Sequence, residues 1–276
     1  MLRVTGPGRA EIESATPVDE AALADALDRC FAEDLAGERV EAVDWWVPVG
    51  DWGARRTAWR LGFSYAGVLP GWAGGADAWA LTLRRGDPRE PRTTWLDNPV
   101  VEGDGVRLRP FTDADVPRIA EGIGDAATQY WLSFFPRGFD EADGRRYVET
   151  VQERLATNHT VTWAFCATDD DRLLGAVGLH RISDEPELGY WAHPDARGRG
   201  LTTRAAALAV GHAFEVLRLP RLAAYASAGN TASLRVLERL GMRRSGVQRQ
   251  AVHTGDGTAV DLVGYDLLAA EHPARA

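Results

Sequence analysis

The chain has 276 residues, of which 45% are hydrophobic and 26% charged, and its formal net charge at pH 7 is −9. This composition is typical of a soluble globular protein, and the length favours two domains or one large one. The negative charge argues against a sequence-independent nucleic-acid partner, because such binding depends on neutralising phosphates. It suits an acceptor that is cationic or bears an amine.

The sequence shows no sign of a membrane span or of a secretion signal. No apolar run approaches membrane-spanning length, and the segment from Met1 to Pro17 is polar and broken by Gly and Pro. Cys30 and Cys166 lie in different segments, which fits buried free thiols in a reducing compartment. We therefore expect a cytoplasmic protein with no membrane partner.

The first part of the chain alternates helix and strand patterns. Leu23, Leu27 and Phe31 recur at helical spacing, and Gly62 stands where a helix prefers a left-handed residue. A segment rich in Pro and charge predicts a domain boundary near 86–100. The predicted elements are a helix at 18–32, a strand at 40–49, a helix at 50–61 and a strand at 79–83.

The second part predicts a longer mixed α/β order. It opens with a hairpin signal at 100–108, and Thr112 stands where it would cap a helix from Asp113. Residues 129–136 are aromatic and otherwise unpatterned, which predicts a loop. The further predicted elements are a helix around 147–155, strands at 160–167, 173–179 and 187–192, a helix at 203–217, a strand at 222–226, a helix at 231–240 and a strand at 260–268.

The chain contains a weak internal repeat. The segment from Gly50 to Phe63 aligns with that from Gly229 to Met242 at an offset of 179 residues, so that Gly50 lies over Gly229. Upstream helices and downstream strands also correspond when small gaps are allowed. Chance similarity of two helix-to-strand boundaries is the alternative. If the repeat is real, the first part is the back half of a domain whose front half is missing.

A glycine-rich turn joins the predicted strand at 187–192 to the predicted helix at 203–217. Its core, Arg197 to Gly200, holds two glycines, which can adopt positive φ and let a ligand approach the backbone closely. A turn at the front of a helix offers unpaired N–H groups and the positive end of the helix dipole to phosphate. Arg197, Arg199 and Arg204 add positive charge. An ordinary turn between strand and helix is the alternative.

Other phosphate-binding and metal-binding motifs are excluded. A P-loop requires Gly-Lys-Ser/Thr, and the sequence contains no lysine, which also excludes Schiff-base chemistry. The dinucleotide fingerprint requires a third glycine where Thr203 stands. No His-Glu-x-x-His or Cys-x-x-Cys spacing is present, so we expect no metal site.

Two motifs resemble those of the GNAT N-acetyltransferases. Arg197, Gly200 and Thr202 occupy the fixed places of that family's Arg/Gln-x-x-Gly-x-Gly/Ala turn, with threonine as a departure in the third. The segment from Asn230 to Met242 resembles the family's Asn-x-x-Ser/Ala helix. With Glu187 to Trp191 before the turn, the pattern resembles the RimJ/RimL-like branch, which acetylates amino groups. The resemblance covers about residues 100–270.

The resemblance implies an acetyl-CoA site around this turn. The pantetheine arm would lie beside the strand ending at Trp191-Ala192, and the pyrophosphate would bind the N–H groups of Arg199 to Thr203. Aligning Phe31 with Phe214 places Ser14 to Glu20 opposite the turn, where Pro17, Asp19 and Glu20 are unsuited to phosphate, so one site per chain is expected. The residues assigned to the cofactor are Trp191, Ala192, Arg197, Gly198, Arg199, Gly200, Leu201, Thr202, Thr203 and Asn230.

Acyl transfer requires a base for the amine and an acid for the leaving thiolate. Glu187 is the leading base because it begins the strand beside the implied thioester, with a solvated carboxylate or an ion pair as the structural alternative. Asp184 and Glu185 are the next candidates. His180 and His193 flank that strand and are more often structural hydrogen-bonding residues than proton carriers.

The acid is harder to assign. The family's usual tyrosine would fall at Leu237, which cannot donate a proton, so Ser233 is the candidate, directly or through a water molecule. Capping of the helix start is the alternative role for Ser233. Asn230 is expected to contact the cofactor arm or a bound water. The aromatic residues of the loop at 129–136 would form either a lid over the acceptor or a contact between domains.

We therefore expect an α/β protein with a GNAT-like catalytic domain at 100–276, preceded at 1–95 by a truncated, non-catalytic GNAT-like repeat. The expected reaction moves an acetyl group from acetyl-CoA to a primary amine of a small molecule or a peptide N-terminus. A non-catalytic acyl-CoA-binding or regulatory module is the main alternative, and a tandem scaffold without cofactor is the second. A homodimer is left open by the sequence.

Overall fold

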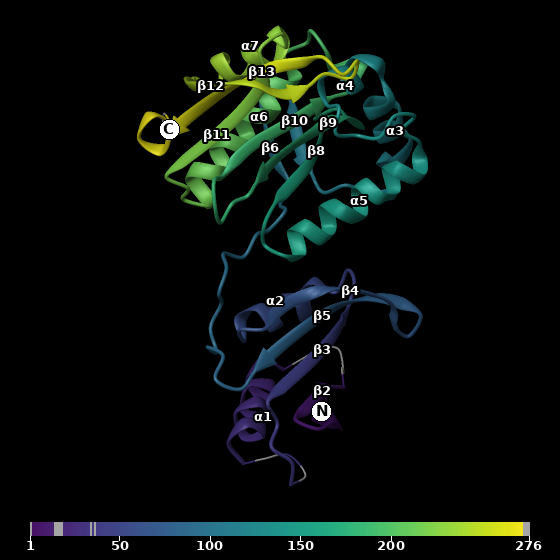
Figure 1. Ribbon diagram of the computed structural model, residues 1–276, viewed down its shortest axis with the longest axis vertical. Helices are drawn as coiled ribbons and strands as arrows, with labels where there is room; N and C mark the ends of the chain where they lie inside the picture. Colours follow the sequence, from purple (N-terminus) through teal and green to yellow (C-terminus); the bar gives the residue numbers. More distant parts are fainter. Residues whose placement is uncertain (1, 14–18, 34, 36, 273–276) are drawn as a thin grey trace. The chain divides into compact units, whose positions relative to one another are not determined.

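The computed structural model describes residues 2–13, 19–33, 35 and 37–272, and the chain divides into two compact units, Met1–Trp95 and Leu96–Ala276 (Figure 1). The described residues contain no helix long and apolar enough to cross a membrane. The predicted mixed α/β class is confirmed, because each unit packs helices on a mixed sheet.

The first unit is a five-stranded sheet with the order β1-β2-β3-β5-β4 and two helices. Its core is built on fully buried side chains of α1, β3 and β5, among them Leu27, Trp45 and Leu81. The sequence analysis predicts none of the strands β1, β2 and β4, because they are short or largely exposed. The elements are β1 Leu2–Gly6, β2 Arg9–Ile12, α1 Glu20–Glu33, β3 Ala42–Pro48, α2 Trp52–Arg60, β4 Ser64–Ala73 and β5 Ala76–Arg84.

The second unit is an eight-stranded sheet with the order β12-β13-β11-β10-β9-β8-β7-β6. Its strands are β6 Val101–Gly103, β7 Val106–Arg109, β8 Val161–Ala167, β9 Asp170–His180, β10 Glu187–Ala192, β11 Arg221–Ser227, β12 Arg243–His253 and β13 Ala259–Leu268. Its helices are α3 Val116–Gly124, α4 Ala126–Trp131, α5 Glu141–Ala156, α6 Leu201–Gly211 with a π-helical continuation His212–Val216, and α7 Thr231–Arg239. Short 3-10 turns lie at Asp113–Asp115, Pro194–Ala196 and Ala269–Glu271.

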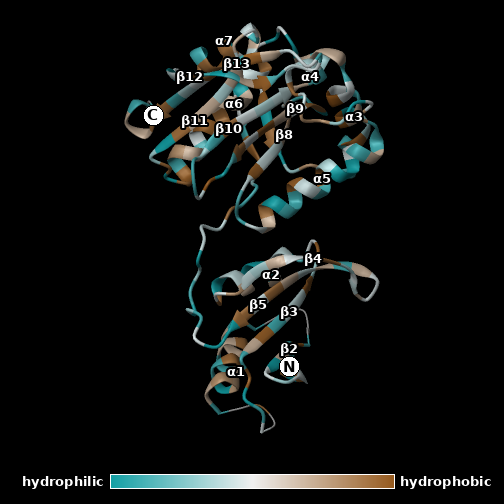
Figure 2. Ribbon diagram, in the orientation of Figure 1, coloured by the Kyte–Doolittle hydropathy of each residue, from teal (hydrophilic) through white to brown (hydrophobic). Residues whose placement is uncertain are grey.

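Helices cover both faces of this sheet. Ala164 of β8 packs in a core with residues of α3 and α5, while its neighbour Trp163 packs edge-on against His212 after α6. Successive residues of a strand point to opposite faces, so α3 and α5 cover one face and α6 the other. Hydrophobic residues concentrate on the middle strands between these layers (Figure 2). A Cβ added at Gly122 of α3 would lie 2.6 Å from the ring of Trp191, so α3 approaches β10 as closely as glycine allows.

The sheet separates between β10 and β11. These two strands are parallel, and they pair only at Glu187↔Ala223 and Leu188↔Ala224. Beyond that point β10 stays paired with β9 as far as Ala192, and β11 stays paired with β13 as far as Ser227. The second half of β10 therefore has no strand partner on its β11 side, which leaves an opening with free backbone groups at the carboxyl ends of both strands.

Several predicted elements are corrected by the structure. The helix predicted from Thr203 begins at Leu201 and changes to π-helix at His212. Part of the predicted aromatic loop belongs to α4, whose start is capped by Asp125. The helix expected from Asp113 begins as a 3-10 turn and continues as α3. β12 was missed because it is exposed almost throughout and so lacks an alternating pattern.

The two units share a topology at the internal repeat. β3 and β11 have the same bounds at an offset of 179 residues, and so do α2 and α7. β2 and β3, which flank α1, pair in parallel, and so do β10 and β11, which flank α6. The pairing register of β4 with β5 shifts between Tyr65 and Gly67, and that of β12 with β13 shifts at the corresponding place, between Arg244 and Gly246. Most of the segment aligned with the glycine-rich turn lies outside the described residues.

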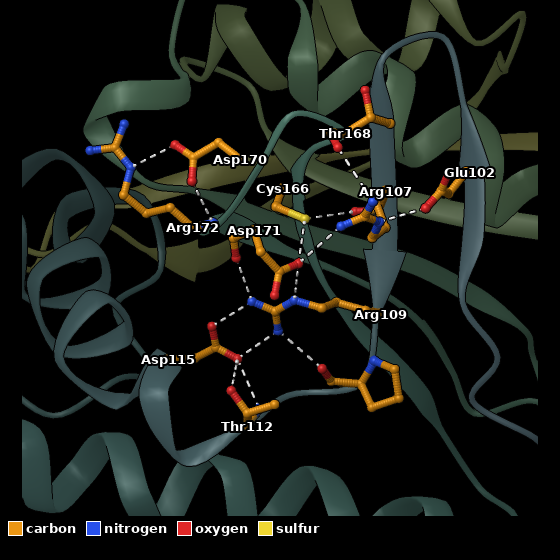
Figure 3. A network of polar contacts seen from close by, with 11 residues as sticks. Glu102, Arg107, Arg109, Thr112, Asp115, Cys166, Thr168, Asp170, Asp171 and Arg172 are labelled. Carbon is orange, nitrogen blue, oxygen red and sulfur yellow. Dashed lines mark hydrogen bonds and ion pairs between the residues drawn. The ribbon is translucent and has the colours of Figure 1, made fainter.

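A polar network fixes the start of α3 to the sheet (Figure 3). The guanidinium of Arg109 on β7 donates two hydrogen bonds to the carboxylate of Asp115, at 2.7 and 2.8 Å, and a third to Asp171 on β9. Asp115 in turn accepts the backbone N–H of Thr112 at 2.8 Å. Arg109 and Asp115 are buried, so each charge is matched where water cannot compensate it.

Candidate active site

The glycine-rich turn has the backbone that its sequence predicts. Gly198 and Gly200 both have a φ of +72°, and a Cβ at either position would meet nothing within 4 Å. These positions therefore need glycine for backbone conformation, and the space above them is open. Gly200 is the residue before α6 and no side chain caps the helix, so the first N–H groups, from Leu201 to Thr203, face this space.

The three arginines of the turn differ in what they contact. Arg197 donates to Asp125 at the start of α4 and to the hydroxyl of Thr128 at 2.8 Å. Arg199 donates to the backbone oxygen of Asp195 at 3.2 Å, and Arg204 to that of Asp104 at 3.0 Å. All three lie at the turn, but the charge of Arg197 is matched by the carboxylate of Asp125. Burial opposes ionisation of Asp125, but hydrogen bonds from Arg197 and Thr128 lower its pKa.

His193 has a structural role in this turn. Its side chain is fully buried, and its Nδ1 accepts the N–H of Asp195 at 3.2 Å and lies 3.1 Å from Nη2 of Arg118. Arg118 also donates to the carboxylate of Asp195 at 3.0 Å and to the backbone oxygen of Leu173 at 3.1 Å. These contacts join the turn to α3 and β9, which supports the structural alternative for His193.

Glu187 lies at the closed end of the opening between β10 and β11. It is paired with Ala223 on one side and with His180 on the other, two residues before the strands separate. Burial raises the pKa of the Glu187 carboxyl, while nearby Arg181 opposes the rise. Burial also lowers the pKa of His180 to about 4, so this imidazole is neutral at pH 7. A half-buried carboxyl with a raised pKa is suited to proton exchange near neutral pH.

The other acidic candidates have ion-pair partners. Asp184 accepts from Arg181 at 2.8 Å, and Glu185 accepts from Arg221 at 3.4 Å and from the hydroxyl of Tyr225 at 3.2 Å. These contacts favour Glu187 as the proton acceptor.

At the open end, the side chain of Asn230 caps α7. Its Oδ1 accepts the N–H of Ser233 at 3.1 Å, so helix capping belongs to Asn230 and the Ser233 hydroxyl is not needed for it. The hydroxyl of Ser233 instead lies 2.9 Å from the phenol oxygen of Tyr190 on β10. The sequence analysis had not assigned Tyr190 any role. Leu237, at the place of the family's usual tyrosine, is 1% exposed in the core.

The two residues of β10 that the sequence analysis assigns to the cofactor have different surroundings. Trp191 is 6% exposed, packs in the core with α3 and α5, and donates its Nε1 proton to the hydroxyl of Tyr147 at 3.2 Å. Its side chain is therefore not available at the opening, and its backbone pairs with Ala176 of β9. Ala192 ends β10, and its carbonyl lies 3.5 Å from the Arg197 guanidinium.

The aromatic residues after α4 lie beside the β12–β13 hairpin. Gly255 donates its N–H to the carbonyl of Tyr130 at 2.8 Å, and Ser133 donates its hydroxyl to the carbonyl of His253 at 2.6 Å. Phe134 is 76% exposed. A cavity of about 260 Å³ lies between the two segments, lined by Gln129, Ser133, Phe135, Arg137, His253, Thr254, Gly255 and Gly257.

Among the described residues, no cluster of three or more His, Cys, Asp or Glu side chains has the arrangement of a metal site. Cys30 and Cys166 are buried free thiols, and burial raises the pKa of Cys166 to about 11, so neither is activated as a nucleophile.

Comparison with known proteins identifies the second unit. The family described as "Acetyltransferase (GNAT) domain" matches residues 106–243. The Bacillus subtilis protein named "Putative ribosomal N-acetyltransferase YdaF" is 36% identical over 175 residues, which cover 60% of this chain and 92% of YdaF. This chain belongs to the GNAT acetyltransferase family. It is an N-acetyltransferase by that membership, and an acyltransferase by reaction class.

Further similarities support the GNAT assignment. The Bacillus subtilis protein named "Uncharacterized N-acetyltransferase YoaA" is 26% identical over 174 residues, covering 62% of this chain and 97% of YoaA. A GNAT acetyltransferase structure from Bacillus anthracis matches with a TM-score of 0.55 at 22% identity, covering 62% of this chain and 99% of that one. The structure of Mycobacterium smegmatis RimJ in complex with CoA-disulfide matches with a TM-score of 0.55 at 21% identity, over 61% of this chain and 84% of RimJ. At these identities the structural matches establish the fold.

Proposed function

We propose that the second unit transfers an acetyl group from acetyl-CoA to a primary amine. The observation that carries the proposal is the opening between β10 and β11, which leads at its wide end to the uncapped N-terminus of α6. The backbone groups of Tyr190 and the N–H of Ala192 face away from β9 and can pair with the amide groups of a pantetheine arm, as a strand would. The N–H groups of Arg199 to Thr203, with the charges of Arg199 and Arg204, suit a pyrophosphate.

The reacting groups would meet where the strands separate. Glu187, half-buried with a raised pKa, takes a proton from the acceptor ammonium. The Ser233 hydroxyl, at the start of α7, donates to the sulfur as the thioester bond breaks. Asn230 holds the first turn of α7 in place through its cap and leaves its amide N–H groups to contact the cofactor arm or a water molecule.

The acceptor would enter beside the aromatic segment and the β12–β13 hairpin, which border the cavity described above. An amine acceptor suits the net charge of −9. The similar protein YdaF is named a putative ribosomal N-acetyltransferase. A peptide or protein N-terminus is therefore the first acceptor class to examine, followed by small-molecule amines.

We further propose that the first unit is a truncated GNAT-like repeat that binds no cofactor. Its topology and strand register repeat those of β10 to β13 in the second unit, and the residues described in the first unit form no counterpart of α3 to α5. Asp19 and Glu20 at the start of α1 would repel a pyrophosphate. Acetyl-CoA should therefore bind once per chain.

Calorimetric titration of acetyl-CoA tests both proposals. Wild-type protein should bind at one site per chain, and an Arg199→Glu/Thr202→Pro double variant should lose binding while keeping its far-ultraviolet circular dichroism. Release of thiol across a panel of peptides and amines then tests catalysis. Binding without thiol release would favour a non-catalytic acyl-CoA-binding module, for which the core leucine at position 237 is the supporting observation. Absence of binding would overturn the cofactor site.

A further inference from the structure

A hydrogen bond connects β10 to the first turn of α7, beyond the point where the backbones of β10 and β11 pair. The phenol oxygen of Tyr190 lies 2.9 Å from Oγ of Ser233 and 3.2 Å from the backbone oxygen of the same residue. Tyr190 belongs to the half of β10 that has separated from β11, and Ser233 to the first turn of α7, which follows β11. The contact therefore spans the opening in which the proposed acetyl transfer takes place.

The contact is not required to build α7. Asn230 already satisfies the N–H group of Ser233, and the core side of α7 is anchored by Leu237. Within the described part of the chain, Tyr190 is the only hydrogen-bond partner of the Ser233 hydroxyl. A serine hydroxyl near a helix start otherwise rotates freely or bonds to a nearby carbonyl. Tyr190 gives this hydroxyl a defined partner instead.

We propose that Tyr190 is a positioning residue that orients the Ser233 hydroxyl toward the sulfur of the bound thioester. This inference rests on the proposed acetyl-CoA reaction. It deepens that reaction, because α7 offers Leu237 where a phenol would otherwise stand, and β10 provides a phenol from the other side of the opening. The Tyr190 O–H has two acceptors, the backbone oxygen and Oγ of Ser233, and when it donates to Oγ the serine proton is free to point to a third group.

The amine nitrogen forms a bond to the thioester carbon, the carbon–sulfur bond breaks, and its electron pair stays on sulfur. Between ammonium and amide the nitrogen loses two protons, one passed by Glu187 to solvent and one that neutralises the thiolate. The Ser233 O–H stabilises the charge on sulfur until that proton arrives, and a chain of two hydroxyls polarises each bond in it. Burial raises the pKa of Tyr190 to about 12, so the phenol remains a donor throughout the neutral range.

The test is a double-mutant cycle with Tyr190→Phe, Ser233→Ala and the double variant, in the full-length chain. Removing one donor to a developing charge costs on the order of 100-fold in kcat, so we expect about that loss for Ser233→Ala. We expect about a tenfold loss for Tyr190→Phe, with the KM for acetyl-CoA changed less than about twofold. The double variant should be no slower than Ser233→Ala alone, because residues acting as a unit are not additive.

Tyr265→Phe is the matched control. It removes a phenol that lies 3.4 Å from Glu238 on the same helix, away from the opening, and should leave kcat unchanged. A second readout is the thiolate absorbance of bound CoA during a pH titration. Hydrogen bonding to the charged form lowers a thiol's pKa, so Tyr190→Phe and Ser233→Ala should both raise it.

Losses in kcat that multiply in the double variant, or an unchanged thiol pKa in Tyr190→Phe, would overturn the positioning role. Failure of wild-type protein to bind CoA or to release thiol would instead overturn the proposed function. The two failures are therefore distinguishable.

Discussion

Arg197 of the glycine-rich turn and Asp125 at the start of α4 form an ion pair across 72 residues of sequence. The same carboxylate caps α4 by accepting the N–H of Thr128 at 3.0 Å. One carboxylate thus holds together the turn assigned to the pyrophosphate and the helix that leads to the proposed acceptor side.

The first prediction follows from this pairing. Arg199→Gln should weaken acetyl-CoA binding by about two- to fivefold, because a free charge near a pyrophosphate contributes roughly 0.3–1 kcal/mol. Arg197→Gln should chiefly lower the unfolding temperature, since its charge is committed to Asp125. Calorimetry at low and high salt distinguishes the two, as only the Arg199 effect should fade with screening. Equal salt dependence in both variants would contradict the assignment.

The second prediction concerns the glycines at the two ends of α6, whose replacement should have opposite effects on stability. Gly200, just before the helix, has a φ of +72°, and Gly211, its last residue, has a φ of −57°. Gly200→Ala should destabilise the fold by about 1–2 kcal/mol through left-handed strain. Gly211→Ala should stabilise it by about 0.5–1 kcal/mol, because alanine is favoured in a helix and its Cβ would meet only Glu215, at 3.9 Å. Chemical denaturation measures both, and the same sign for the two variants would be inconsistent with the backbone.

The third prediction concerns the buried carboxyl of Glu187. Burial raises its pKa above the unfolded value, so its contribution to stability is fully present below the unfolded pKa and lost as pH rises through the folded pKa. Glutamine does not ionise, so Glu187→Gln removes this pH-dependent loss of stability. The variant should therefore gain stability relative to wild type as the pH rises from acid to neutral.

Activity gives a second measurement on the same residue. In wild type, the apparent pKa of the acid limb in the pH profile of kcat/KM should lie above the ordinary pKa of a glutamate. In Glu187→Gln this limb should disappear. Glu185→Gln serves as the control, because its carboxylate is held by Arg221 and Tyr225. An acid limb that survives in Glu187→Gln would assign the base to another group.

The fourth prediction concerns the network in Figure 3. Arg109→Met would leave the Asp115 carboxylate, whose side chain is 4% exposed, without its main counter-charge. Removing one partner of a buried pair costs about 3–5 kcal/mol, so urea denaturation should show a loss of that order. Arg107→Met, which removes a more exposed guanidinium of the same network, should cost far less. Similar losses in the two variants would show that burial is not the deciding factor.

Elements with local signals could be predicted from the amino-acid sequence. The glycine-rich turn, the helix beginning after Asn230 and the middle strands were predicted because glycine conformation, capping and hydrophobic runs depend on neighbours along the chain. The same signals supported the family resemblance. The internal offset of 179 residues was also visible in sequence, since it appears as repeated residue types.

Features that depend on partners distant in sequence were visible only in the fold. β12 carries little hydrophobic alternation and β1 is only five residues long, and pairing with neighbouring strands fixes the backbones of both. The commitment of Arg197 to Asp125 and the approach of Tyr190 to Ser233 join residues 72 and 43 positions apart. No spacing rule predicts such pairs, because hydrogen bonds form between groups that the fold brings within about 3 Å. Ser233 was thus a candidate from the sequence, whereas its contact with the phenol of Tyr190 became visible only in the structure.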